Sequence, residues 1–350
     1  MLDSYALLER LCNTPGIPGF EDEVREVIAE IVKPFADAMR VDALGNLIVT
    51  RRGRSPFRLM LDAHMDEIGF MVQYIDEQGF IRFTPMGGWD PRLLLSHLLT
   101  ILTRDRQRVE GVIGTVPPHI LKPGDREKVV QVEEMFLDVG ATSRQEVAEM
   151  GVRVGDPIVI HYPFRRIGKD TVMGKALDDR AGCAVMIKTL EALQGADVDA
   201  TIYAAFVVSE ERGLIGARTA AFQIEPDMAI ALEGTVGADM PGVPAPRQPT
   251  GLGKGPAITV ADGGFIVPRR MVQALEGTAE REGIPYQIKV PPYGGTDASA
   301  IHQSRGGVFS GVVSVPCRYI HSPLSTCRLS DFDNTWKLLA AFCKAATTVK

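Results

Sequence analysis

Asp62-Ala63-His64-Met65-Asp66-Glu67 is the stretch around which this chain is organised. It follows an apolar run from Phe57 to Leu61, interrupted only by Arg58, which predicts a buried strand. His64 therefore stands where a strand ends, with Asp66 two residues further on. A metal-bound imidazole uses one ring nitrogen for the metal and needs a partner for the other, which a nearby carboxylate can supply. A His-x-Asp pair alone is weak evidence, because satisfied surface pairs are about ten times more common.

The sequence on both sides of this stretch predicts an α/β fold. Apolar residues between positions 20 and 35 recur at the helical period, and short strands are expected at 39–41 and 47–50. The same pattern resumes near Arg165, with expected strands at 201–208, 228–232 and 311–315 and expected helices at 269–282 and 331–347. Helices that alternate with strands in this way are typical of an α/β sheet, here made of residues 1–65 and 165–350.

The character of the sequence changes between these two parts. From residue 66 to residue 164, short apolar runs are broken by glycine and proline. Only one helix is expected there, beginning at Ser143 with Glu146 three residues later as a capping box. Residues 66–164 are therefore predicted to form a small β-rich domain inserted into the α/β domain.

Composition narrows the classes of protein. The 350 residues carry a formal net charge of −6 without a basic stripe, so nucleic acid is not an expected partner. The start, Met1-Leu2-Asp3-Ser4, has no secretory pattern, and the longest apolar run, Leu93 to Leu102, is too short to span a bilayer. Five dispersed cysteines without a Cys-x-x-Cys pair favour reduced core thiols in a cytoplasmic protein.

Five metal-ligand side chains follow predicted strands. They are His64, Asp178, Glu211, Glu233 and His321. Ligands of an open sheet gather at the carboxyl ends of its strands, so these residues are expected to converge despite their separation in sequence. Two histidines and three carboxylates suit two zinc-like ions with one carboxylate between them.

Alternatives remain open for two of these residues: Asp178 can cap a helix, although Asp179 also can, and Glu233 can be a solvated strand-end acid. The adjacent pair Glu210-Glu211 is the strongest signal, because neighbouring like charges after an apolar strand repel each other unless cations compensate them. The metal interpretation of this pair is favoured by about three to one.

Ordered motifs along the whole chain resemble the TET-type metalloaminopeptidases, a group that includes glutamyl and deblocking aminopeptidases, some formerly labelled endoglucanases. The motifs are Ala63-His64-Met65-Asp66-Glu67-Ile68-Gly69, Gly87-Gly88-Trp89-Asp90, Pro117-Pro118-His119, Leu177-Asp178-Asp179-Arg180, Glu210-Glu211 with Gly213 and Gly216, Gly294-Gly295-Thr296-Asp297, and Arg318-Tyr319-Ile320-His321-Ser322-Pro323.

This resemblance implies a mixed-sheet, co-catalytic metallopeptidase domain that removes the N-terminal residue of peptides with two divalent metal ions per subunit. Zinc is the first expectation, with cobalt and manganese as alternatives. His64 and His321 would each serve a different metal, bridged by Asp178. Glu211 would complete the His321 site and Glu233 the His64 site.

The resemblance also implies roles outside the ligand set. Glu210 would be the general base, and Asp66 would orient His64. The β-rich insertion would be a dimerisation domain, and dimers would assemble into a hollow tetrahedron of twelve subunits. The chain departs from the family twice, because the family usually has aspartate where Glu233 stands and glutamine where Ser209 stands. Glu233 keeps the charge but adds a methylene group.

Other functions compete with aminopeptidase activity. An enzyme of the same metal class can be a carboxypeptidase or an N-acyl amino acid deacylase. A glycosidase fits less well, because two carboxylates suffice for that chemistry and the histidines would have no role. A non-catalytic binding protein of the same fold is a different class, and the intact Glu210 argues against it. The preferred first residue of the substrate is not readable from the sequence.

Overall fold

A mixed eleven-stranded sheet forms the larger part of the molecule in this computed structural model, which describes residues 1–290 and 293–349. Its order is β1-β2-β12-β3-β13-β16-β17-β11-β10, and β14 joins β16 to β15. Strands β3, β12, β13 and β16 run parallel. The bounds are β1 Ala38–Val41, β2 Leu47–Arg51, β3 Arg58–His64, β10 Arg165–Ile167, β11 Thr171–Gly174, β12 Thr201–Val207, β13 Met228–Val236, β14 Ala257–Thr259, β15 Gln287–Lys289, β16 Phe309–Arg318 and β17 Ser325–Arg328.

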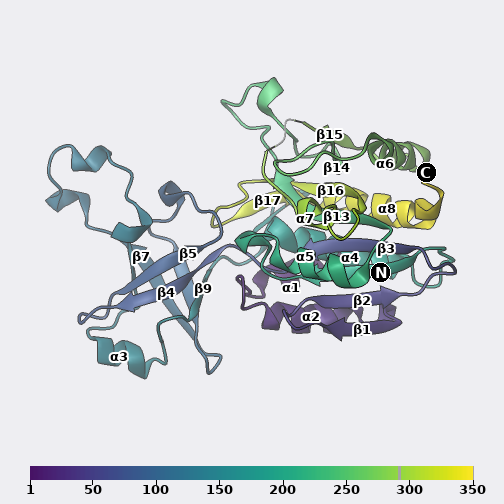
Figure 1. Cartoon of the computed structure of the whole chain (residues 1–350). Helices are drawn as coiled ribbons and strands as arrows, with labels where there is room; N and C mark the ends of the chain where they lie inside the picture. The colour runs from purple at the N-terminus through teal and green to yellow at the C-terminus, as the bar shows by residue number, and fades with distance from the viewer. Residues whose placement is uncertain (291–292, 350) are drawn as a thin grey trace.

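Helices cover both faces of this sheet (Figure 1). On one face α4 and α8 pack against the strands, with α1, α2 and α6 against them; on the other face lie α5 and α7. The bounds are α1 Ser4–Asn13, α2 Asp22–Val32, α3 Arg144–Glu149, α4 Leu177–Ala192, α5 Ile215–Ile224, α6 Arg269–Glu282, α7 Ala298–Ile301 and α8 Leu329–Ala345.

Side-chain alternation along β3 shows how the sheet serves both layers. Leu59, Leu61 and Ala63 enter the larger core, whereas Met60 enters the smaller core under α5. Because the side-chain period of a strand is two, Asp62 and His64 point to the same side as Met60. Asp62 thus occupies a fully buried position between the apolar residues Leu61 and Ala63 of this strand.

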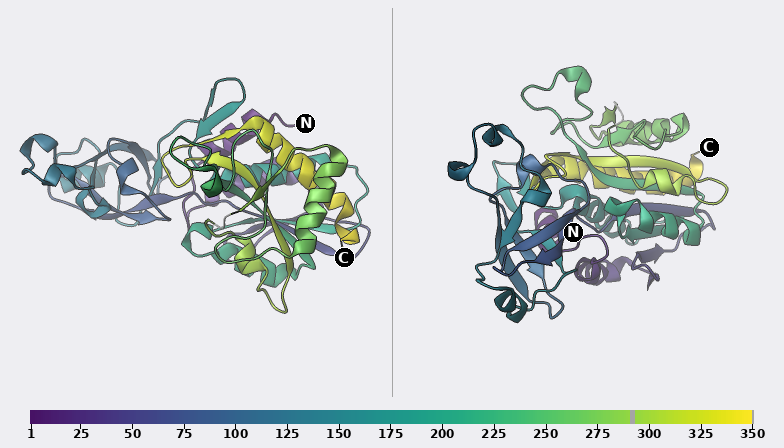
Figure 2. Two further views of the ribbon diagram at one scale, coloured as in Figure 1. Left: turned by 90° about the horizontal axis from the view of Figure 1, so that it is seen from above. Right: turned by 60° about the vertical axis from the view of Figure 1, so that its left-hand side comes forward.

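The inserted segment forms a closed barrel that projects from one end of the sheet (Figures 1 and 2). Its order is β4-β5-β8-β7-β6-β9, and it has its own core around Phe70, Phe83 and Leu137. The only α-helix between β4 and β9, α3, begins after Ser143, whose hydroxyl accepts a hydrogen bond from the Glu146 amide. The barrel strands are β4 Gly69–Ile75, β5 Ile81–Met86, β6 Leu98–Leu102, β7 Arg108–Gly114, β8 Phe136–Asp138 and β9 Pro157–Ile160.

The predicted α/β fold with a small β-rich insertion is confirmed, with corrections to individual elements. Strand β13 continues to Val236, so Glu233 lies inside the strand and not just beyond it. Strand β16 is longer than the predicted 311–315, and helix α5 was not predicted at all. All five cysteines are buried and free, as expected of core thiols. In the described part of the chain, no helix combines the length and apolar character needed to cross a membrane.

Candidate metal centre

The predicted ligands meet at the edge of the sheet where the parallel strands have their carboxyl ends. His64 is the last residue of β3, and Glu233 lies in the neighbouring strand β13. Glu211 lies in the short 3-10 helix η6, Glu210–Arg212, which follows β12. Asp178 opens α4, and His321 follows β16. The expected convergence of these five residues is therefore observed.

The five side chains form two groups that share one carboxylate. His64, Asp178 and Glu233 present ligand atoms within 4.8 Å of one another, and so do Asp178, Glu211 and His321. Asp178 Oδ1 lies 3.4 Å from His64 Nε2, and Asp178 Oδ2 lies 3.7 Å from His321 Nε2. The two oxygens of Asp178 therefore face different histidines, which is the arrangement of a carboxylate that bridges two cations.

The ring orientation of His64 leaves its Nε2 atom available to a metal ion. Its Nδ1 lies 3.0 Å from the carbonyl oxygen of Asp66, and a carbonyl oxygen can only accept a hydrogen bond. The geometry therefore assigns the proton of neutral His64 to Nδ1 and a lone pair to Nε2, which faces Asp178 and Glu233. Burial alone would lower the pKa of His64, but hydrogen bonds with Asp178 and Asp66 outweigh it and raise this pKa.

His321 is oriented in the same way by a residue of the loop that follows β5. Its Nδ1 lies 3.0 Å from the carbonyl oxygen of Gly88, so Nε2 is left facing Asp178 and Glu211. The backbone of His321 has a left-handed φ of 56°. Its side chain is 42% exposed, so little else packs around the ring. The inserted segment thus contributes directly to the geometry of the site.

Asp66 does more than contact His64. Its Oδ1 accepts a hydrogen bond from the Glu210 amide at 3.0 Å, and its Oδ2 accepts one from the Glu211 amide at 3.1 Å. Burial would raise the pKa of Asp66, but the contact with His64 and these amides lowers it overall. Asp66 therefore holds His64 mainly through its backbone carbonyl, with Oδ1 a further 3.4 Å contact to Nδ1, and it holds the backbone of the glutamate pair through its carboxylate.

The site holds a surplus of buried negative groups, which is the condition that cations relieve. Burial, together with nearby carboxylates, raises the pKa of Glu210 to about 9 and that of Glu211 to about 8. Burial also raises the pKa of Asp62 to about 8. Among the described residues, no N–H or O–H group donates a hydrogen bond to the carboxylate oxygens of Asp62 or Asp297, and these two carboxyl groups lie close enough to share a proton. The donor set therefore fits divalent cations.

Sequence reasoning missed three contributors to this centre. Asp62 and Asp297 are fully buried beside the ligands, and the Asp297 amide donates a 3.3 Å hydrogen bond to Glu233 Oε1. An aspartate in the middle of an apolar strand was the available signal for Asp62. Gly88 stood in a motif without a role, because a backbone carbonyl leaves no trace in residue type.

Replacing Gly88 by alanine tests how His321 is positioned. The added Cβ would lie 3.3 Å from His321 Nδ1, which is closer than most carbon contacts, so the ring must shift. Changes to groups that orient a metal ligand typically reduce metal affinity about ten- to a hundredfold. We therefore expect the ion at His321 to bind more weakly by this factor. Titration with Zn²⁺ measures this. Gly306→Ala, which meets nothing within 4 Å, is the control; equal affinity in both variants would contradict the prediction.

Comparison with known proteins places this chain in a family. A family model described as M42 glutamyl aminopeptidase matches residues 45–338. A putative aminopeptidase of Acetivibrio thermocellus is 41% identical over 337 residues, 96% of this chain and 97% of that protein. The structure of an aminopeptidase from the archaeon Desulfurococcus kamchatkensis has 39% identity and a TM-score of 0.95, covering 99% of this chain and 97% of the other.

A third similarity is to the TET1 peptidase of Pyrococcus horikoshii, with 34% identity, a TM-score of 0.87 and coverage of 97% and 99% of the two chains. That peptidase can assemble into a tetrahedron or a large octahedral shell. The fold and the matches define an enzyme, a hydrolase that acts on peptide bonds. The chain belongs to the M42 peptidase family.

Proposed function

We propose that this chain is an aminopeptidase that uses two divalent metal ions to remove the N-terminal residue of peptides. The observation that carries the proposal is Asp178, whose two carboxylate oxygens face His64 on one side and His321 on the other. A single ion would leave one of these histidines without a role.

The ligand assignment follows the two groups. His64, Glu233 and Asp178 would hold one ion, and His321, Glu211 and Asp178 the other. Imidazole and carboxylate ligands suit zinc, and they also accept cobalt or manganese. When bound, such ions polarise the scissile carbonyl group and make a water molecule acidic enough to react near neutral pH.

Glu210 is the proposed general base. It belongs to neither ligand group, yet its Oε2 lies 4.0 Å from His64 Nε2, so it borders the centre without being required as a ligand. Its carboxylate would take a proton from the attacking water and deliver it to the leaving amine. Asp66 would act as a positioning residue, because its contacts fix His64 and the Glu210 backbone.

Substrate comparison tests the activity. Cleavage of amino acid amides and short peptides with a free α-amine is expected to require metal and to stop when the amine is acetylated. An N-acyl amino acid deacylase would prefer the acetylated compounds, and a carboxypeptidase would release the last residue first. A metal-loaded protein that cleaves none of these compounds would be a binding protein of the same fold.

We also propose that the inserted segment, residues 66–164, is a dimerisation domain and that dimers build a twelve-subunit tetrahedron in the cytoplasm. The barrel exposes large apolar side chains, among them Leu98 at 46% and Ile120 at 73%, and exposed apolar groups commonly mark interaction surfaces. The assembly of the P. horikoshii relative supports the same proposal. Buried free thiols support a reducing compartment.

Sedimentation tests the assembly. The full chain should sediment as a species several times larger than its 38.1 kDa subunit. Because metal content can influence association, the measurement is made on metal-loaded and chelator-treated protein. A monomer under both conditions, at the concentrations used for activity measurements, would contradict the proposed oligomer.

A further inference from the structure

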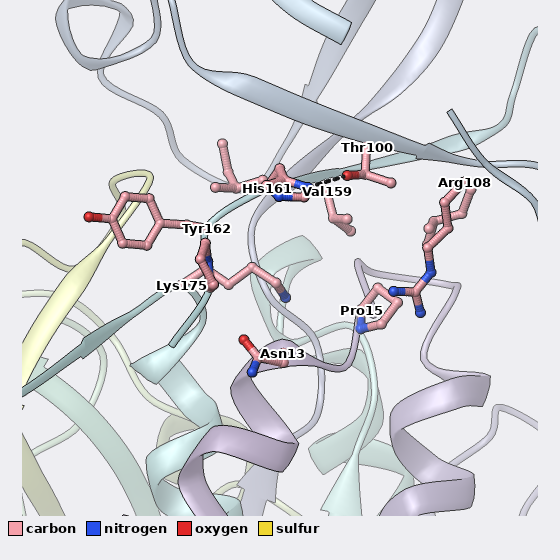
Figure 3. A pocket seen from close by; sticks show the side chains of 11 residues that line it. Asn13, Pro15, Thr100, Arg108, Val159, His161, Tyr162 and Lys175 are labelled. Atoms are coloured by element: carbon pink, nitrogen blue, oxygen red, sulfur yellow. Dashed lines mark hydrogen bonds between the residues drawn. The ribbon is translucent and has the colours of Figure 1, made fainter. Parts of the chain in front are cut away.

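A cavity lies where the barrel meets the α/β domain (Figure 3). It has a volume of about 150 Å³. Asn13 and Lys175 line it from the α/β domain, and Thr100 and Arg108 line it from the barrel. His161, in the segment that leads from β9 back to the α/β domain, completes this set of polar side chains.

Hydrogen-bond donors dominate the polar lining of this cavity. Asn13 uses its Oδ1 to accept a 2.9 Å hydrogen bond from the Phe164 amide, which leaves its NH2 group for other partners. Arg108 and Lys175 are cationic, and the Thr100 hydroxyl lies 3.2 Å from His161 Nδ1, within hydrogen-bond distance (Figure 3). Among the described residues, neither aspartate nor glutamate lines the cavity. A lining of this composition suits an anion.

Beneath the cavity, two buried cations contact the same carboxylate. Lys175 Nζ lies 2.6 Å from Glu67 Oε1, and the fully buried Arg180 lies 3.7 Å from the same oxygen. Two cations therefore share one carboxylate. Burial lowers the pKa of Lys175 although Glu67 opposes this effect. A further anion beside Lys175 would compensate the surplus charge.

The cavity is next to the proposed metal centre. Ile160 and Lys175 line it, and the same two residues line the pocket that contains Asp178, Glu211 and His321. Lys175 precedes Asp178 by three residues, so their Cα atoms are at most about 11 Å apart, because consecutive Cα atoms lie about 3.8 Å apart. Three residues of an extended peptide reach about 10 Å, so a peptide of this length can cover a separation up to about this upper limit.

We propose that this cavity binds the C-terminal carboxylate of a short peptide, of about three residues, whose N-terminal residue lies at the metal centre. The inference rests on the proposed function, and it names a substrate class for it: short peptides with a free carboxyl terminus. Lys175 and Arg108 would supply the positive charge, and the NH2 group of Asn13 would supply a neutral donor. The C-terminal carboxylate of a longer peptide would lie beyond this cavity, so the cavity would not increase the affinity for that peptide.

Calorimetric binding of non-hydrolysable peptides to the metal-loaded protein tests the inference. The probe is tri-alanine with its first peptide bond reduced to a methylene-amine, prepared with a free carboxylate and as the C-terminal amide. Charge-assisted hydrogen bonds are the strong ones, so the acid should bind about tenfold more tightly than the amide. For the corresponding hexa-alanine pair, the two affinities should be equal.

Arg108→Ala and Arg106→Ala are matched variants for this measurement. Both arginines lie on the hairpin of β6 and β7 and pair with glutamates of α2, Arg108 with Glu23 and Arg106 with Glu26, but only Arg108 lines the cavity. Arg108→Ala should remove the tenfold preference for the tripeptide acid, and Arg106→Ala should keep it.

Three results would overturn the inference: equal binding of the tripeptide acid and amide, the same preference in the hexapeptide pair, or equal effects of the two arginine substitutions. The last two would indicate a general electrostatic attraction by the arginines of this hairpin. Binding needs no turnover, so the outcome does not depend on the activity. If the protein cleaves no peptide but the acid still binds more tightly, the proposed function fails and the carboxylate site stands.

Discussion

Replacing Glu210 by glutamine should leave both metal ions bound and reduce turnover by about a hundred- to ten-thousandfold, the usual range for loss of a general base. Glutamine has the shape of glutamate but cannot accept the proton from water at neutral pH. Glu210 stands outside both ligand groups, so the ions do not depend on it. Metal analysis and the rate of hydrolysis of an amino acid amide, measured on the same sample, give the result.

Glu211→Gln is the matched control for this experiment. Glu211 is the next residue, its amide is held by the same Asp66 carboxylate, and its Oε1 lies 3.5 Å from His321 Nε2. This variant should lose affinity for the ion at His321, whereas Glu210→Gln should not. A near-normal rate in Glu210→Gln, or loss of metal in both variants alike, would remove Glu210 from the role of general base.

The larger features of the fold were predictable because they depend on periodicity. The apolar run before His64 and the 3.6-residue pattern of residues 20–35 predict their elements without reference to the rest of the chain. Convergence of the five ligand-type residues was predictable for a related reason. Parallel strands have their carboxyl ends at one edge of the sheet, so residues that follow different strands come together there.

Features that depend on tertiary contacts were not predictable in the same way. The Gly88 carbonyl orients His321 across 233 positions of sequence, and any residue type can supply a carbonyl group. Asp66 was expected to orient His64, but its hydrogen bonds to the amides of Glu210 and Glu211 depend on how η6 packs against β3. The cavity lined by Lys175 depends on how the barrel packs against the α/β domain.

For Glu233, the strand-end pattern of the sequence predicts the neighbourhood correctly but not the position within the strand. The sequence correctly places it near the other ligands, but it lies inside β13, opposite Ser314 of β16, and not at the end of the strand. Its side chain is about 6% exposed, so the alternative of a solvated acid does not hold. The longer glutamate side chain brings Oε2 to 3.8 Å from His64 Nε2 without a break in the strand.

Replacing Glu233 by alanine should therefore lower the metal content from two ions per subunit towards one and abolish most activity. The change leaves the ion at His64 with one charged ligand, Asp178, which it shares with the second ion. Loss of a ligand commonly costs tenfold or more in affinity. Glu233→Asp should retain both ions with altered affinity, because the Asp297 amide that contacts Glu233 Oε1 still offers its hydrogen bond to a carboxylate.

The control is Glu225→Ala, which removes a surface acid that is 44% exposed and pairs with Arg305. This control has the same formal charge as Glu233→Ala, so a difference in metal content between the two variants reflects position and not net charge. Metal analysis of both purified proteins decides the matter. Two tightly bound ions and normal turnover in Glu233→Ala would mean that Glu233 is not a ligand, and that the ion at His64 takes its charge from another of the buried carboxylates beside it, such as Asp62 or Asp297.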